Sequence, residues 1–385
     1  MNDQRLKLLA IHSLTIMLVV IVIAIAISPS NQSKIYADEN LDKKNAERSS
    51  DLNNTELEVE VISDGIISKD ELKSNSLGDK YIIIKKNEKS LFPVEVKDYY
   101  MDRSIKVVVK GLNSKNFHDA SIIRINKDQT FSGLPDMTDE ETLDYVKNFH
   151  INYVKDEATG LYTAIIYITL NNVYANFVYQ DDENIYIDLK RPKDVYDKIV
   201  VVDAGHGGTD PGTYSQGEEY YEKDINLSIV HYLKELLDKE EIKVYYTRTT
   251  DETIFLNPRV YFANDVEADF FISIHCNGNE SSKPCGAEVL YNDIVLDNGF
   301  QSKQLAQICL EELTNVTHKV NRGLVTGEDV VIVNKAKMPI ALLELGFMSN
   351  PEEMNFLIQE SNRQDIAEGI HKAILKAYGE LDNYK

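Results

Sequence analysis

The spacing of hydrophobic and polar positions changes near residue 192 of this chain. Before that point, short runs rich in Ile, Val and Tyr are separated by Asn, Asp and Gly, which is typical of β-strands joined by turns. These runs lie at 57–63, 80–86, 104–111, 121–126, 161–170, 173–180 and 184–190. They predict a small β-rich domain over residues 57–191, sandwich-like or α+β, and nothing in it points to catalysis.

One helix is predicted within this β-rich region. Thr138 and Glu141 have the spacing of a capping box, in which each side chain bonds to the backbone N–H of the other residue. Apolar residues follow at helical spacing, at Leu143, Val146 and Phe149. The capping box and this spacing together predict a helix that interrupts the strands.

After a short connector, strands alternate with helices over residues 198–381. The runs IVVVDAGHGG at 199–208 and FFISIHCN at 270–277 are largely apolar up to their last residues, which is typical of strands buried on both faces. This alternation predicts an α/β sandwich whose active residues lie at the C-terminal strand ends and in nearby loops. Further strands are predicted at 244–248, 287–291, 329–333 and 340–345, and helices at about 224–240, from 257, and at 300–316, 351–358 and 361–379.

The N-terminal residues have the pattern of a membrane segment followed by a linker. A basic flank precedes a largely apolar run at 8–27, whose length is near that needed to span a bilayer. Signal peptides usually have shorter apolar regions, which favours a retained anchor at residues 1–28, although 33–37 offers a cleavage site. In either case the basic flank predicts export of the rest of the chain. The polar residues 29–56 are predicted to be a flexible linker.

Charge and cysteine content restrict the partners and the chemistry. The formal net charge of the 385 residues is −22, and we expect no nucleic-acid partner because binding a phosphate backbone requires a basic face. Three cysteines are too few for a disulfide framework. Cys276 follows His275 on a predicted strand, where neighbours point to opposite faces, so it is predicted to be a small buried residue rather than a ligand or nucleophile.

Two histidines occupy equivalent places in the predicted sheet. His206 and His275 each end a buried strand, so both are expected at the same sheet edge. Glu222 stands just before the helix predicted at 224–240. Two imidazoles and a carboxylate with one open position are a common ligand set for catalytic zinc. The alternative for Glu222 is an acid in the first helical turn, stabilised by the helix dipole.

Glu344 lies in an otherwise apolar strand, LLELGF, where an ionisable group needs a reason to exist. A structural ion pair is one explanation. A general base beside the metal is the other, and it is favoured because burial raises the pKa of a carboxyl toward the useful range.

Five motifs in order resemble one family, the zinc-dependent N-acetylmuramoyl-L-alanine amidases of bacterial cell-wall metabolism. The resemblance covers roughly residues 198–380. It implies a twisted, mostly parallel sheet flanked by helices, one Zn²⁺ and a catalytic Glu344. The motifs are VVDAGHGGTDPG, EKDINL, a TR followed by NPRVYFAN, FFISIHCNGN and MPIALLELGFMSN. The residues that match the family's ligands are His206, Glu222 and His275, and those that match its recurring Arg and Asn are Arg259 and Asn264, which we assign to structure or substrate contact.

The resemblance also implies a substrate and a location. The substrate is peptidoglycan, cut at the amide between N-acetylmuramic acid and the L-alanine of the stem peptide, outside the cytoplasm. The protein is then membrane-anchored, or secreted if the N-terminal segment is cleaved. The alternatives are a zinc peptidase of related fold and a catalytically silent wall-binding protein. Some family members carry a long helix that blocks the site, and the short stretch between Tyr291 and Gln301 has no room for one.

Overall fold

A computed structural model describes residues 80–86, 94–118, 121–125, 131–132, 145–215, 217, 219–296 and 299–384. The chain divides into two units, Met1–Glu56 and Leu57–Lys385, and the described residues all belong to the second unit. The predicted membrane segment, the linker and the strand predicted at 57–63 lie outside the described residues. Within the described part of the chain, no helix combines the length and the apolar character that a membrane crossing requires.

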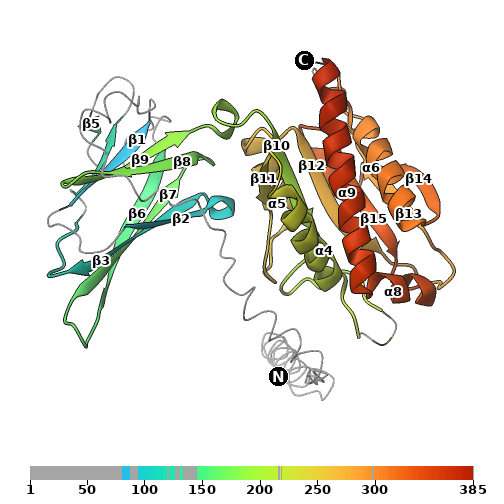
Figure 1. Ribbon diagram of the computed structural model, residues 1–385, viewed down its shortest axis with the longest axis horizontal. Helices are drawn as coiled ribbons and strands as arrows, with labels where there is room; N and C mark the ends of the chain where they lie inside the picture. The colour runs from blue at the N-terminus through green and yellow to red at the C-terminus, as the bar shows by residue number, and fades with distance from the viewer. Residues whose placement is uncertain are drawn as a thin grey trace, which may run out of the picture. The chain divides into compact units, whose positions relative to one another are not determined.

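The N-terminal strands form two antiparallel sheets that share one core (Figure 1). The sheet orders are β5-β4-β1-β9-β8 and β2-β3-β7-β6. Alternate side chains of both sheets meet between them, among them Ile84, Val107, Ile166 and Ile187, as in a β-sandwich. The strands are β1 Tyr81–Lys85, β2 Glu95–Tyr99, β3 Ser104–Leu112, β4 Ile122–Ile125, β5 Phe131–Ser132, β6 Val146–Lys155, β7 Tyr162–Leu170, β8 Ala175–Gln180 and β9 Asn184–Lys190.

The helix predicted to follow Thr138 is wrong where the structure describes it. Val146 and Phe149 both lie in strand β6, whereas Thr138, Glu141 and Leu143 are outside the described residues. The reason is a competing period of two, because every second side chain from Phe149 to Tyr153 packs against the sandwich core. Strand β2 was also missed, since its sequence EVKDY is largely polar.

The C-terminal part has a six-stranded sheet in the order β11-β10-β12-β15-β13-β14. The first four strands of this order are parallel, whereas β13 runs antiparallel to β15, and β14 is parallel to β13. The predicted mostly parallel sheet is therefore confirmed, with two reversed strands at one edge. The strands are β10 Ile199–Ala204, β11 Lys243–Tyr246, β12 Phe270–Asn277, β13 Ala287–Tyr291, β14 Asn321–Thr326 and β15 Ile340–Phe347.

Helices cover both faces of this sheet. Val200 and Val202 belong to the core that includes residues of α4, α6, α8 and α9, while Ile199 and Val201 belong to the core that includes residues of α5 and α7, so β10 is buried on both faces. Helices α4 and α9 lie side by side (Figure 1). The helices are α4 Glu222–Leu237, α5 Leu256–Asp265, α6 Ser302–Thr317, α7 Val331–Lys335, α8 Pro351–Leu357 and α9 Glu360–Leu381, with 3-10 turns at Tyr100–Asp102, Pro192–Asp194 and Asp382–Tyr384.

The strand predicted at 329–333 is also wrong, because these residues lead into the short helix α7. Its Ile332 and Val333 are buried against the sheet, and a short apolar run has the same composition in a strand or a helix. The actual strand is β14, NRGLVT, a mostly exposed edge strand without an apolar pattern.

Candidate metal centre

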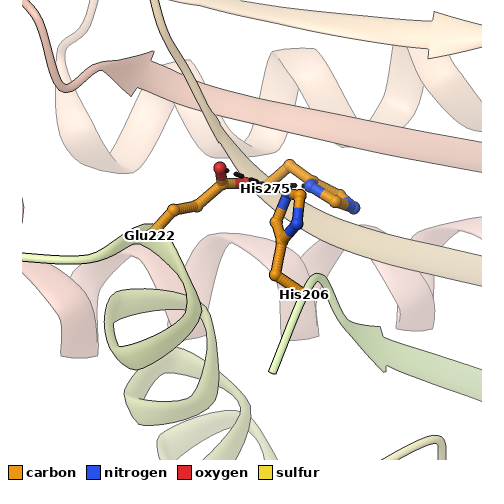
Figure 2. A group of neighbouring side chains, drawn as sticks. All are labelled: His206, Glu222 and His275. Carbon is orange, nitrogen blue, oxygen red and sulfur yellow. Dashed lines mark hydrogen bonds and ion pairs between the residues drawn. The ribbon is translucent and has the colours of Figure 1, made fainter. Parts of the chain in front are cut away.

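The three predicted ligands come together at one edge of the α/β sheet. His206 follows β10, His275 lies near the end of the neighbouring parallel strand β12, and Glu222 is the first residue of α4. Figure 2 shows the glutamate side chain reaching from the helix toward both imidazole rings. The ring centroids are 4.9 Å apart, and one donor atom from each residue lies within 4.8 Å of the other two. This convergence is the arrangement expected of a metal centre.

Glu222 is held between the histidines by both side chains and backbone. Its Oε1 lies 2.9 Å from Nδ1 of His275, and its Oε2 lies 3.3 Å from Nε2 of His206. Backbone N–H groups of Cys276 and Thr213 donate to these two oxygens at 3.0 and 2.8 Å. Burial opposes ionisation, but the hydrogen bonds and charges of the histidines outweigh it and hold the pKa of Glu222 well below its usual range. Glu222 is therefore a fixed carboxylate rather than a simple helix-capping acid.

His206 is oriented by Asp210. Its Nδ1 lies 2.8 Å from Oδ2 of Asp210, and a carboxylate only accepts, so Nδ1 carries the proton and Nε2 faces the centre. Burial alone would lower the pKa of His206, but Glu222 and Asp210 raise it to about 9. Asp203 also stands near His206 in the chain. Asp203, however, accepts its hydrogen bonds from Arg259, Ser273 and Thr247 and not from an imidazole.

Two glycines allow the ligands to approach the backbone closely. A Cβ on Gly205 would lie 2.3 Å from Cε1 of His275. A Cβ on Gly212 would lie 2.5 Å from Oε2 of Glu222, and the φ of Gly212 is +68°. Gly205 and Gly212 therefore make space for the side chains of the candidate ligands.

Glu344 lies beside the centre on β15, directly opposite His275 in the parallel register with β12. Its Oε2 is buried and accepts no hydrogen bond from any described residue. Burial raises the pKa of Glu344 to about 7, and the negative charges of Glu222 and Glu288 contribute less to the rise. Glu288 lies on β13, directly opposite Glu344 in the antiparallel register with β15. A carboxyl with such a pKa and one oxygen without a hydrogen-bond partner is suited to exchanging protons with a ligand.

A cavity of about 600 Å³ opens at this edge of the sheet. Glu222, Glu344 and both histidines line it, so the four predicted chemical residues face one space. The remaining lining residues are mainly small or polar: Thr213, Tyr214, Cys276, Asn277, Gly278, Asn279, Glu280 and Ser349. Residues 292–301 join β13 to α6, and their described part contains no helix that would cover the cavity.

Three further predicted residues lie outside the reacting space or are inert. Arg259 is buried and bonds to Asp203 and to backbone carbonyls. Asn264 donates to the carbonyl of Lys335 and accepts from the backbone of Lys337, which fixes the segment before β15. Neither residue lines the cavity, and the contacts that the structure shows for both are structural. Cys276 is buried as predicted, and burial raises its pKa well above the ordinary thiol value, which keeps it protonated.

The α/β fold, with His206, Glu222, His275 and Glu344 around one cavity, places the protein in the class of hydrolases with a candidate metal centre. The sequence family described as N-acetylmuramoyl-L-alanine amidase matches residues 200–376. The chain is 30% identical to the germination-specific N-acetylmuramoyl-L-alanine amidase of Bacillus subtilis, over 48% of this chain and 81% of that protein. It is 31% identical to a protein of Staphylococcus saprophyticus named probable cell wall amidase LytH, over 68% and 86% of the two chains.

This chain belongs to the N-acetylmuramoyl-L-alanine amidase family. It is a peptidoglycan hydrolase that cleaves the amide between N-acetylmuramic acid and L-alanine, and it acts outside the cytoplasm, at the cell wall. Family membership decides against the zinc peptidase and the silent wall-binding protein. Among solved structures, an N-acetylmuramoyl-L-alanine amidase from Clostridium difficile 630 is 34% identical, over 47% of this chain and 97% of that chain, with a TM-score of 0.45.

Proposed function

We propose that His206, Glu222 and His275 hold one Zn²⁺ ion and that Glu344 is the acid–base of amide hydrolysis. The donor set supports the metal, because two imidazoles and a carboxylate converge while the cavity leaves a further position open. When bound, zinc supplies a Lewis acid that polarises the amide carbonyl and makes water more acidic. The centre suits a cation, because Glu222 supplies a negative charge and the Nε2 of His206 is directed toward the Glu222 carboxylate.

The acid–base role rests on the partnerless oxygen of Glu344. In the proposed reaction, Glu344 accepts a proton from the attacking water and later delivers it to the nitrogen of the departing L-alanine. A carboxyl with a pKa of about 7 exists in both forms near neutral pH and therefore suits both steps. The buried Oε2 without a protein hydrogen bond is the single observation that carries this assignment.

The test is Glu344→Gln in the full chain. This variant keeps the shape of the side chain but removes the proton-accepting group, so it should bind one zinc like wild type and lose nearly all turnover of peptidoglycan. Zinc content is measured by mass spectrometry, and products are identified as stem peptides with a free N-terminal L-alanine. Glu280→Gln is the matched control, because Glu280 lines the same cavity and has no role in the proposed chemistry. Full turnover by Glu344→Gln would remove Glu344 from the mechanism.

We also propose that the apolar run at residues 8–27 anchors the enzyme in the membrane, with the rest of the chain outside the cytoplasm. The support is the length of the run and its basic flank. Deletion of residues 1–28 behind a cleavable export signal should move the protein from the membrane fraction to the medium. Equal recovery of both forms in the medium would show that the run does not anchor the chain.

A further inference from the structure

Two buried arginines bind the backbone that carries the candidate metal ligands. The carbonyls of Ala204, Gly205 and His206 follow one another at the end of β10, and all three accept from Arg248 or Arg259. These arginines are 1% and 2% exposed, and neither lines the catalytic cavity. Their hydrogen bonds to the ligand-bearing segments are therefore made to backbone carbonyls.

Arg259 fixes the conformation of His206. Its Nη2 donates to the carbonyl of His206 at 2.7 Å, while its Nη1 donates to Ala204 at 2.7 Å and to Asp203 at 2.6 Å. His206 has a φ of +60°, a left-handed conformation that is unfavourable for a residue with a side chain. The hydrogen bond to its carbonyl offsets this cost and keeps the imidazole directed toward Glu222.

Arg248 joins the two segments that supply ligands. Its Nη2 donates at 2.9 Å both to Gly205, which precedes His206, and to Lys223, which follows Glu222. One guanidinium therefore sets the distance between the end of β10 and the start of α4. The Nε and Nη1 of the same guanidinium donate to the carbonyls of Ala204 and Thr250, and lysine, with a single nitrogen, cannot make all these contacts in the same geometry.

We propose that Arg248 and Arg259 are positioning residues that set the zinc affinity of this centre by arranging His206 and Glu222 before the ion binds. The proposal rests on the proposed metal centre and adds a role for residues that contact neither the ion nor the substrate. Groups that orient metal ligands typically change metal affinity about 10–100-fold when they are removed. Loss of the arginine fork is expected to have an effect of that size, because it frees the backbone on both sides of the site.

The test uses Arg248→Lys and Arg259→Lys, which keep the positive charge and remove only the fork. Arg363→Lys is the matched control, because Arg363 also donates to two backbone carbonyls, of Leu357 and Ile358, which lie outside the segments that carry the candidate ligands. Its Nε donates to Ser228, six residues after Glu222 on α4. The zinc Kd is measured by competition with a chromophoric chelator, and the Tm of each zinc-free protein is measured in parallel.

The two test variants should raise the zinc Kd about 10–100-fold, whereas Arg363→Lys should lower the zinc-free Tm and leave the zinc Kd unchanged. An unchanged Kd in Arg248→Lys and Arg259→Lys would overturn the proposal and leave both arginines as ordinary structural residues. If neither variant folds, Ser273→Ala removes one donor to Asp203, the anchor of Arg259, and an unchanged Kd there would overturn it as well. Wild-type protein that binds no zinc would instead overturn the metal centre itself.

Discussion

The carboxylate of Asp210 and the imidazole of His206 form a hydrogen bond, with 2.8 Å between Oδ2 and Nδ1. This contact assigns the proton of the ring to Nδ1 and leaves Nε2 as the nitrogen that faces Glu222. Asp210 therefore determines which nitrogen of a candidate ligand is available, although it is itself outside the ligand set.

Replacement of Asp210 by Ala should weaken zinc binding about ten-fold, because the ring then loses the group that orients it. It should also lower the pKa of His206 in the zinc-free protein, since Asp210 is one of the two groups that raise it. Chelator competition measures the first effect and an NMR titration of His206 the second. A His206 pKa that stays near 9 would show that Glu222 alone sustains it.

The stability of the zinc-free protein should depend on pH in a defined direction. The pKa of His206 is raised to about 9, so its contribution is complete below the ordinary value near 6.5 and is lost as pH rises through 9. The pKa of Glu222 is depressed, so its contribution is present above its ordinary pKa and is lost as pH falls below that value. Urea unfolding of zinc-free protein should therefore give a higher free energy at pH 6 than at pH 9.5. Equal values at these two pH values would contradict the interaction between His206 and Glu222.

Zinc binding should become stronger over the pH range in which the zinc-free protein loses stability. The ion must displace the proton that His206 holds in the zinc-free state, so zinc affinity should increase between pH 6 and pH 9. Isothermal titration in two buffers of different ionisation enthalpy measures the proton release. Zinc binding without release of a proton at pH 7 would exclude a protonated His206 in the zinc-free protein.

Gly205→Ala should damage the centre more than its small added volume suggests. The new Cβ would lie 2.3–2.6 Å from ring atoms of His275, so the ring must move, at a cost of about 1–3 kcal/mol in unfolding free energy and with loss of zinc. Gly379→Ala in α9 is the control, because a Cβ there meets nothing within 4 Å and alanine favours a helix. Zinc content and thermal unfolding separate the two variants, and normal zinc binding by Gly205→Ala would disprove the close approach.

Glu288→Gln should shift the pH profile of hydrolysis. Glu288 is one of the groups that raise the pKa of Glu344, and glutamine keeps the size of the side chain and an acceptor oxygen for one of its two donors, Asn277 or Arg322. If Glu344 acts as the base, the rate rises as pH increases through its pKa, and this ascending limb should move to lower pH in the variant. The pH dependence of kcat/KM measures the shift. If the ascending limb of the profile does not move, the group that titrates in it is not Glu344.

The sequence predicted that the candidate metal ligands lie together because the information is local. His206 and His275 each end an apolar run, and parallel strands bring such ends to one edge whatever the details of packing. The same reasoning placed Glu344 on a buried strand beside them. Glu222 required the family motif, because an acid in the first turn of a helix is common.

What sequence did not reveal depends on contacts between distant segments. Asp203 and Asp210 lie three and four residues from His206 in the chain, and only the turn after β10 decides which one meets the ring. The carbonyls bound by Arg248 lie on segments that no spacing rule relates. The helix predicted after Thr138 was wrong for a different reason, since the same residues also carry the two-residue alternation of a strand.

The two backbone N–H groups that bind Glu222 have an evolutionary consequence. Every residue except proline supplies this donor, so the direction of the carboxylate does not depend on which side chains stand at positions 213 and 276. Substitutions of Thr213 or Cys276 therefore leave the hydrogen bonds to Glu222 in place, and the residue types at these positions can change while the centre is kept. Distant relatives of this enzyme should be sought without requiring a cysteine after the second histidine, and proline should be the residue that natural variants avoid at both places.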